Sequence, residues 1–188
     1  MHSTASLSTP LPGRPVRVLG ISGSLRVDSH NTAALRAVAA LANPAVQLTL
    51  FDGLAAIPPF CEDCENDPAP AVEELRSALR EADALLISTP EYNSTVPGQL
   101  KNALDWASRP YGDSPLTGKT TTLISASPSA YGAQWAQDDL RKILTTCGAH
   151  VTDHSLAIPE AHTAFGPDGL PHHPDLHTNL ATLLHHLH

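Results

Sequence analysis

One short apolar run limits the possible folds of this chain more than any other feature. Residues 84–89 (ALLIST) are largely apolar and lack the alternation of a strand that has one face in water. A strand of this kind is buried on both faces, as in the middle of a parallel sheet with helices above and below it. The run therefore predicts an α/β protein.

Similar short runs alternate with helical patterns along the rest of the chain. Helices are indicated where apolar residues recur at three- and four-residue intervals, as at Val72, Leu75 and Leu79. The expected strands are residues 16–22, 46–51, 84–89, 120–126 and 150–157. The expected helices are residues 31–42, 71–82, 98–107, 134–147 and about 176–187. This order predicts a doubly wound five-stranded parallel sheet with right-handed crossovers and helices on both faces.

Length and composition indicate one domain that meets small ligands. The chain has 188 residues, and we assign 16–188 to a single domain and 1–15, which are small, polar and proline-rich, to a flexible tail. Neither a secretory signal pattern nor an apolar stretch of ~20 residues is present, so a cytoplasmic protein without a membrane partner is expected. A net charge of −8 offers no basic face for nucleic acid.

Cysteine and histidine residues give little sign of a metal site. Cys61 and Cys64 form a CxxC motif, but no second pair accompanies it, and acidic neighbours disfavour the thiolates. We therefore interpret the motif as an ordinary surface loop, with metal or redox chemistry as the alternative. Most of the 11 histidines lie near the C-terminus, outside a helical metal-binding pattern. We expect no bound metal.

Ligands of a doubly wound sheet bind at the carboxyl ends of its strands, near the switch in strand order. This rule selects the loops after the first, third and fourth strands. The first of these loops offers hydroxyls, an amide and a guanidinium at the start of a helix; these belong to Ser22, Ser24, Arg26, Ser29 and Asn31. Exposed backbone N–H groups and an arginine suit a phosphomonoester. Helix capping alone would need only one or two such residues, so the loop indicates a phosphate site.

Competing nucleotide-binding motifs are missing. No G-x-G-x-x-G follows the first strand, and the chain has no Walker A lysine signature. Asp52 ends the second strand, where a dinucleotide-binding domain would grip a ribose, but a single acid is weak evidence. None of the three tyrosines begins a Tyr-x-x-x-Lys motif, which argues against a flavin-free short-chain dehydrogenase.

The loop after the third strand reads Pro90-Glu91-Tyr92-Asn93 and reaches a helix at Pro97. A proline-fixed turn that carries an aromatic ring and an amide suits the edge of a flat heterocycle. On composition alone, a plain connection between a strand and a helix explains the segment equally well.

Two long motifs carry a resemblance to a known family. Gly-Ser-Leu-Arg-x-x-Ser-x-Asn in the first loop and Pro-Glu-Tyr-Asn-x-x-x-Pro-Gly-x-Leu-Lys-Asn-Ala-x-Asp-Trp in the second resemble the NAD(P)H-dependent FMN reductases, which include quinone, chromate and azo-dye reductases. The resemblance extends over about residues 16–157. It implies a flavodoxin-like fold, FMN as cofactor, NADPH or NADH as co-substrate, and a homodimer or homotetramer with the flavin near a subunit interface.

The resemblance also implies roles for particular residues. The phosphate of FMN would be held within the first motif by Ser24, Arg26, Ser29 and Asn31, with Ser22 close by. Leu25 of the same motif would also bind the cofactor. The isoalloxazine would be bordered by Pro90, Glu91, Tyr92 and Asn93. Ser127, after the fourth strand, would complete the site. The third loop departs from the family pattern at Ser129, Ala133 and Trp135, where relatives tend to carry glycines and often an arginine.

The expected reaction needs no catalytic side chain, because the flavin passes hydride equivalents from NAD(P)H to a small acceptor such as a quinone. An FMN-binding electron carrier without efficient nicotinamide turnover is the alternative. Arg26, Lys101 and Arg109 are candidates for holding the 2′-phosphate of NADPH. Leu104 and Trp106 are candidates for an apolar face toward a partner subunit, unless both pack in the core of their own chain.

Overall fold

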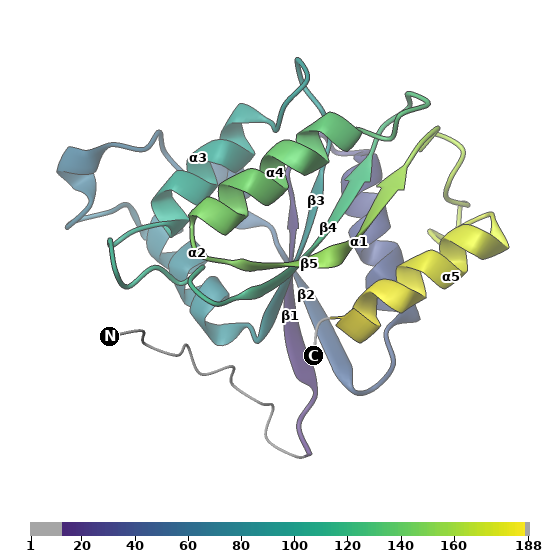
Figure 1. Ribbon diagram of the computed structural model, residues 1–188, viewed down its shortest axis with the longest axis horizontal. Helices are drawn as coiled ribbons and strands as arrows, with labels where there is room; N and C mark the ends of the chain where they lie inside the picture. The colour runs from purple at the N-terminus through teal and green to yellow at the C-terminus, as the bar shows by residue number, and fades with distance from the viewer. Residues whose placement is uncertain (1–12, 187–188) are drawn as a thin grey trace.

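The computed structural model describes residues 13–186, which form a parallel sheet with helices on both faces (Figure 1). The strands are β1 (Val16–Ser22), β2 (Val46–Phe51), β3 (Ala84–Thr89), β4 (Thr120–Ala126) and β5 (His150–Ile158). The helices are α1 (His30–Leu41), α2 (Pro70–Glu81), α3 (Gly98–Ala107), α4 (Gln134–Thr146) and α5 (Pro174–Leu183). Short 3₁₀ helices occur at η1 (Gly53–Ala56), η2 (Glu62–Cys64) and η3 (Leu184–His186).

The order of the strands fixes the place of the switch point. The sheet runs β2-β1-β3-β4-β5, and every neighbouring pair is parallel. The chain winds from β1 outward to β2, and then from β3 outward to β5 on the other side. In sheets of this kind, the ligand-binding crevice lies at this switch in strand order, here between the carboxyl ends of β1 and β3. The predicted doubly wound five-stranded parallel sheet is confirmed.

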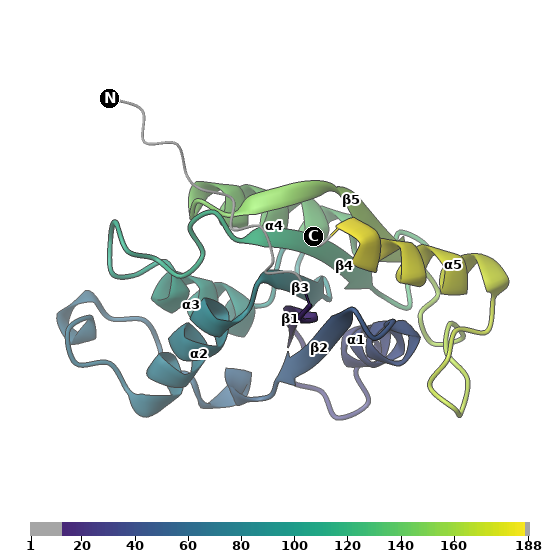
Figure 2. The same ribbon diagram turned by 90° about the horizontal axis from the view of Figure 1, so that it is seen from below.

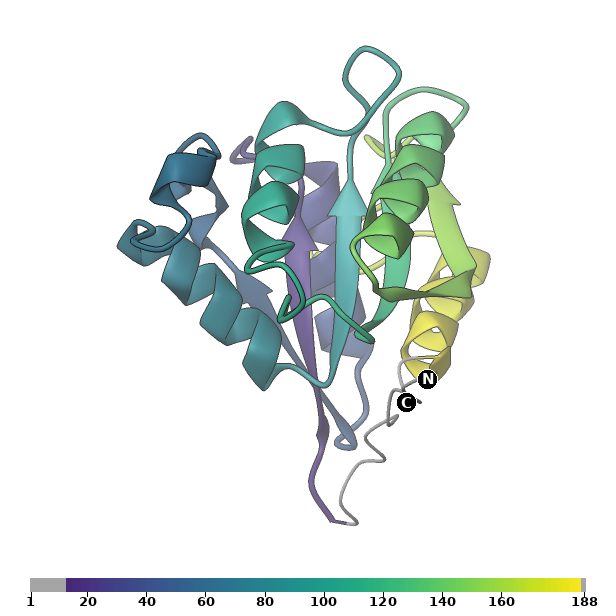
Figure 3. The ribbon, with the colours of Figure 1, turned by 60° about the vertical axis from the view of Figure 1, so that its left-hand side comes forward.

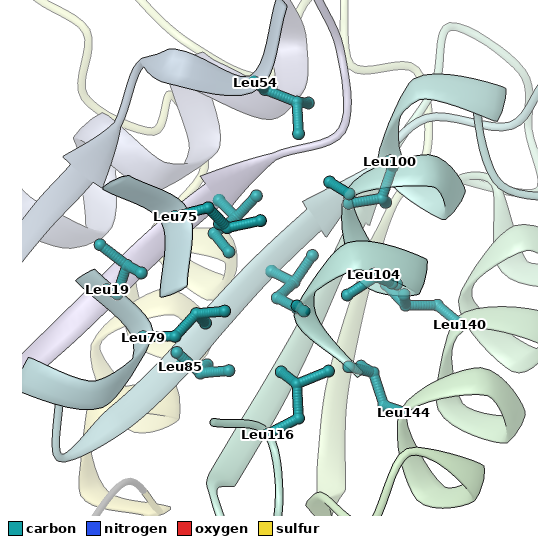
Figure 4. Packing of buried hydrophobic residues seen from close by; sticks show 14 of the residues in the cluster. Leu19, Leu54, Leu75, Leu79, Leu85, Leu100, Leu104, Leu116, Leu140 and Leu144 are labelled. Carbon is teal, nitrogen blue, oxygen red and sulfur yellow. The ribbon is translucent and has the colours of Figure 1, made fainter. Parts of the chain in front are cut away.

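The central strand β3 is buried along its whole length and separates two apolar layers. Leu85 and Ile87 pack with residues of α2, α3 and α4, and Figure 4 shows the leucines of this layer. Ala84 and Leu86 pack on the opposite face with residues of α1 and α5. Figure 2 shows the two groups of helices on the two sides of the sheet. Burial on both faces explains why the run lacks alternation.

Most element boundaries agree with the sequence analysis within one residue, and the differences have local causes. Helix α1 begins one residue earlier than expected because the Ser29 Oγ caps it, accepting from the Thr32 N–H at 3.2 Å. Helix α2 begins at Pro70 instead of the next residue, since proline suits the first helical position. Helix α5 begins at Pro174 for the same reason, and its last expected turn is the 3₁₀ helix η3.

The expectation that Leu104 and Trp106 face a partner subunit is wrong. Both side chains lie in the core of their own chain, 3% and 1% exposed. The Trp106 ring packs edge-on against Phe60, with 5.0 Å between centroids, and its Nε1–H donates to the Pro58 carbonyl at 2.8 Å. These contacts hold the long segment between β2 and α2 against α3. Trp106 therefore has a structural function.

Arg14 is fixed although it belongs to the segment expected to be a flexible tail. Its Nη1 and Nη2 each donate to the Asp83 carboxylate at 2.7 Å. Asp83 also accepts from the Arg17 N–H at 2.8 Å, and the hydrogen bond from Arg14 holds the pKa of its carboxyl below the usual value. The rest of the expected tail, residues 1–12, lies outside the described residues.

The packing of Trp106 can be tested by truncation. Trp106→Ala should lower the free energy of unfolding by about 3–5 kcal/mol, because it leaves a cavity in the core beside Phe60. Trp135→Ala is the matched control, since that ring is 63% exposed, and it should change stability by no more than about 0.5 kcal/mol. Urea denaturation followed by far-UV circular dichroism measures both. Equal losses in the two variants would contradict the assignment of Trp106 to the core.

Candidate cofactor-binding site

Three loops meet at the carboxyl edge of the sheet: loop 1 (residues 23–29), loop 2 (residues 90–97) and loop 3 (residues 127–133). Figure 3 shows the connections after β3 and β4 rising above the ends of their strands. Loop 1 is joined to β3 by the Gly23 N–H, which donates to the Ser88 carbonyl at 2.8 Å. A Cβ on Gly23 would lie 2.8 Å from the Leu100 side chain of α3, so a larger residue there would displace Leu100.

Hydroxyl groups give loop 1 its shape. The Ser22 Oγ accepts from the Thr32 hydroxyl at 2.8 Å, and the Ser24 Oγ accepts from the Arg26 N–H at 3.3 Å. Thr32 lies in the first turn of α1, and the sequence analysis missed it. The spacing could have predicted it, because residues three apart lie on the same face of a helix, and Thr32 follows the capping Ser29 by three positions. The hydroxyls hold the loop in an open curve ahead of the helix.

The start of α1 is electropositive in a chain that is acidic as a whole. The first helical turn leaves the N–H groups of His30 and Asn31 without partners in the helix, at the positive end of its dipole. Arg26 is exposed and belongs to none of the ion pairs of residues 13–186. Burial, Arg26 and His162 lower the pKa of His30, so His30 is neutral at neutral pH. Arg26 is therefore the fixed cation of this site.

Asn31 is turned toward the sheet rather than toward loop 1. Its side chain is 2% exposed and joins the ends of two strands. The Oδ1 accepts from the Ser88 hydroxyl at 2.8 Å and from the Ala126 N–H at 3.1 Å, and the Nδ2 donates to the Ala126 carbonyl at 3.0 Å. What Asn31 presents to the loop is its backbone N–H. Its side chain fixes α1 to β3 and β4 below the site.

Loop 2 is a tight turn attached to α4. Tyr92 and Thr95 exchange backbone hydrogen bonds around Asn93 and Ser94, which both have positive φ angles, 52° and 64°. The Glu91 carboxylate accepts from the Ala136 N–H at 3.3 Å, at the start of α4. The Thr95 hydroxyl donates to Asp139 at 2.6 Å. Glu91 thus positions loop 2 against α4, while Pro90 is buried at the end of β3 and Tyr92 stays 51% exposed.

Loop 3 is held by the segment after β5. The Ser127 N–H donates to the Ile158 carbonyl at 3.1 Å, and the Ser127 Oγ lies 3.2 Å from the Ser129 Oγ. Gly132 has a φ of 60°, and a Cβ there would approach the Ile158 and Pro159 backbone to 3.0 Å. Ala133 follows with a φ of 62° and leads into α4. Loop 3 is therefore a defined wall on the β4 side.

Apolar side chains are exposed around these loops more than elsewhere. Among the described residues, seven large hydrophobic side chains are exposed, and five of them belong to loops 1 and 3, to the Tyr92 turn or to the first turn of α4. The five are Leu25, Val27, Tyr92, Tyr131 and Trp135. Exposed apolar area of this kind marks a ligand or partner site. It borders the start of α1, where hydroxyls, helix N–H groups and the unpaired Arg26 lie together.

Metal or redox chemistry at the cysteines, the alternative left open by the sequence, finds no support in the described residues. Residues 13–186 contain no group of three or more His, Cys, Asp or Glu side chains that could hold a metal ion. Cys61 and Cys64 are both exposed at η2, and a hydrogen bond with Cys61 raises the pKa of the Cys64 thiol. A cavity of about 750 Å³ lies along α3 and α4, but its charged residues include the ion pair of Lys101 and Asp105. It offers no free helix N-terminus to a phosphate.

None of the helices in the described part of the chain is long and apolar enough to cross a membrane.

The fold and the three loops define a flavodoxin-like protein with a site for a flat mononucleotide: an anion cradle at α1 and an apolar rim on loops 2 and 3. The residues fit FMN, because the cradle suits its phosphomonoester and the rim suits its ring. The family model for NADPH-dependent FMN reductases matches residues 16–163. The chain belongs to this family.

Individual relatives agree with the family. An NAD(P)H-dependent FMN reductase of Pseudomonas aeruginosa is 42% identical over 156 residues, covering 82% of this chain and 83% of the relative. A quinone reductase of Pseudomonas putida is 41% identical over 125 residues, covering 66% and 67%. The solved structure of an NAD(P)H:(acceptor) oxidoreductase from Paracoccus denitrificans has a TM-score of 0.83 and 30% identity, covering 91% of this chain and 96% of that chain.

These comparisons confirm the predicted family, the flavodoxin-like fold and the class of enzyme, an FMN-dependent NAD(P)H oxidoreductase. They also confirm FMN as the cofactor and NAD(P)H as the co-substrate.

The function of Asn31 as a clamp can be tested by truncation. Asn31→Ala should lower the free energy of unfolding by about 2–4 kcal/mol, because it leaves the Ser88 hydroxyl and the Ala126 N–H buried without partners. Asn43→Ala is the matched control: the Asn43 Oδ1 also accepts a backbone N–H, from Ala45 at 2.8 Å, but it does so at the surface. Urea denaturation measures the difference. A loss in Asn31→Ala no larger than in Asn43→Ala would refute the clamp.

Proposed function

We propose that this protein oxidises NADH or NADPH and passes the electrons through FMN to a quinone or a similar small acceptor. The observation that carries the proposal is the pairing, at one switch point, of an unpaired cation on loop 1 with an uncharged aromatic rim on loops 2 and 3. Several relatives are named quinone reductases, which supports a quinone as acceptor. FMN, when bound, supplies the redox chemistry by taking a hydride from the nicotinamide and giving electrons to the acceptor.

We propose the following division of work among the residues of the site. Arg26 binds the phosphate through its guanidinium, together with the hydroxyls of Ser22, Ser24 and Ser29 and the N–H groups at the start of α1. Asn31 contributes its backbone N–H and keeps α1 in place through its side chain. Leu25 lies beside Arg26 with its side chain 54% exposed, where it can cover apolar parts of the cofactor.

The isoalloxazine would lie against loop 2, between Pro90 and the exposed Tyr92. Asn93 stands at the tip of the turn, where its positive φ turns the backbone outward. Glu91 supports this turn from behind by capping α4, and Ser127 closes the side formed by loop 3. None of these side chains needs to act as an acid, a base or a nucleophile. Their contribution is to orient the cofactor and the substrates.

The ion pairs show which of the candidate cations are free to bind the 2′-phosphate that distinguishes NADPH from NADH. Lys101 is bound to Asp105 at 2.6 Å, and Arg109 pairs with Glu62 at 3.3 Å and with Glu65 at 3.9 Å. Of the three cations considered for the 2′-phosphate of NADPH, only Arg26 is unpaired, and we assign it to FMN. We therefore propose that none of these three residues binds the 2′-phosphate of NADPH, and that they give the enzyme no strong preference for NADPH over NADH.

We propose that residues 16–188 act as one FMN-binding domain and that the active unit is a homodimer or homotetramer. The packing of α5 against α1 and β5 supports the first point. The groove along α3 and α4 supports the second, because it offers a continuous surface next to loop 2. We further propose a cytoplasmic location, since NAD(P)H is a cytoplasmic reductant, with no nucleic acid or membrane as partner.

The phosphate assignment predicts a specific loss of affinity. Arg26→Ala should weaken FMN binding by roughly 10- to 100-fold, because a hydrogen bond to a charged group contributes about 1.5–3 kcal/mol. Arg36→Ala, which removes an exposed arginine of α1, the helix that follows loop 1, should leave FMN affinity unchanged. Fluorescence titration of the apoprotein measures both variants. Riboflavin, which lacks the phosphate, should bind weakly and equally to all three proteins. Unchanged FMN affinity in Arg26→Ala would refute the assignment of Arg26 to the phosphate.

The oligomer predicts a link between assembly and activity. Diluting the enzyme through its dissociation range should lower the specific activity, because the flavin site is complete only beside a partner subunit. Light scattering alongside the NAD(P)H oxidation assay gives both quantities. A monomer of 19.9 kDa that retains its FMN and its full rate would show that one chain is sufficient.

A further inference from the structure

Two aromatic side chains at the end of loop 3 form a stacked pair in solvent. The rings of Tyr131 and Trp135 are nearly parallel, 12° apart, with 6.4 Å between their centroids. Tyr131 is 77% exposed and Trp135 is 63% exposed. The distance and angle describe an offset stack, in which each ring keeps much of its flat surface free. Both rings belong to the apolar rim of the site, but no individual contact has yet been assigned to either of them.

The pair stands on a rigid base. Tyr131 precedes Gly132, where the backbone of Ile158 and Pro159 leaves no room for a side chain. Trp135 lies in the first turn of α4, which follows the buried Ala133 in its left-handed conformation. A stack on such a base loses little conformational entropy when a ligand covers it. The rings are therefore preorganised for contact.

The pair also borders the proposed flavin site. Trp135 is followed by Ala136, whose N–H donates to Glu91 of loop 2 at 3.3 Å. Glu91 is in turn followed by Tyr92, the exposed aromatic of loop 2. The hydrogen bond between Ala136 and Glu91 thus links the neighbour of Trp135 to the neighbour of Tyr92. An acceptor that approaches the flavin from the side of loop 3 would meet the Tyr131–Trp135 pair.

The chemistry of the pair selects a class of ligand. The two rings offer flat apolar surface in solvent. A planar uncharged aryl compound gains both area burial and stacking there, whereas a small multiply charged oxidant gains neither. A quinone or another planar acceptor can stack on the exposed face of the pair and so extend the existing stack of rings.

We propose that Tyr131 and Trp135 bind the aromatic ring of the electron acceptor and make the enzyme selective for planar uncharged aryl acceptors. This inference rests on the proposed function of the same site. The overall reaction balances as quinone + NAD(P)H + H⁺ → hydroquinone + NAD(P)⁺. The pair takes no part in the electron transfer, and its contribution is to hold the acceptor beside the flavin.

The test compares two acceptors of different chemistry in the FMN-loaded enzyme. Trp135→Ala should lower kcat/KM for 1,4-naphthoquinone by about 3- to 10-fold, mainly through KM, and should leave kcat/KM for ferricyanide unchanged. Trp135→Phe, which keeps an aromatic ring, should restore most of the loss. Leu170→Ala removes an exposed apolar side chain outside the three loops, and it should match the wild type with both acceptors. Equal losses with both acceptors, or no loss with naphthoquinone, would overturn the proposal.

A binding measurement separates this proposal from the proposed function. Trp135 is exposed and Trp106 is buried, so naphthoquinone added without NADH should quench the wild-type tryptophan fluorescence with saturation, and it should not do so in Trp135→Phe. Saturable quenching that needs Trp135 supports the pair even if NADH fails to reduce the flavin, a failure that would refute only the proposed function. If acrylamide cannot reach Trp135 in the assembled protein, a partner subunit covers the ring and the proposal is wrong.

Discussion

Burial of β3 on both faces is the constraint on which the rest of the structure depends. A strand with no face in water needs helices on both sides of the sheet, and α2, α3 and α4 supply one layer while α1 and α5 supply the other. The interior of such a sandwich has no room for a polar ligand. Chemistry is therefore confined to the loops at the strand ends, and the order β2-β1-β3-β4-β5 opens a crevice between two of those ends.

The site in that crevice separates two kinds of recognition. In the proposed site, helix N–H groups, hydroxyls and Arg26 bind the phosphate of FMN locally, in a chain whose net charge is −8. The same proposal assigns the flat ring and its reaction partners to the exposed aromatic side chains. The side chains that fix these surfaces are largely hidden: Asn31 ties α1 to β3 and β4, and Glu91 ties loop 2 to α4. The residues that position α1 and loop 2 thus lie beneath the surface proposed to contact the ligand.

The sequence was sufficient for the sheet, because apolar runs and helical periodicity report burial directly. It also located the three loops, since ligands of a doubly wound sheet bind at the carboxyl ends of its strands. It could not assign the side chains within them. Asn31 and Glu91 are polar residues of the kind that bind ligands. Their side chains instead bind backbone N–H groups that lie 95 and 45 residues farther along the chain. Trp106 likewise looked like an interface residue, although a segment distant in sequence covers it.

The measurement that tests this account most directly is the absorbance spectrum of the purified protein reconstituted with FMN, recorded under anaerobic conditions. The account predicts one equivalent of bound flavin per chain, rapid loss of its visible absorbance when NADH or NADPH is added, and full return when a quinone follows. A bound flavin that neither nucleotide reduces would identify an electron carrier. A protein that does not retain FMN would contradict the cofactor site on which the account depends.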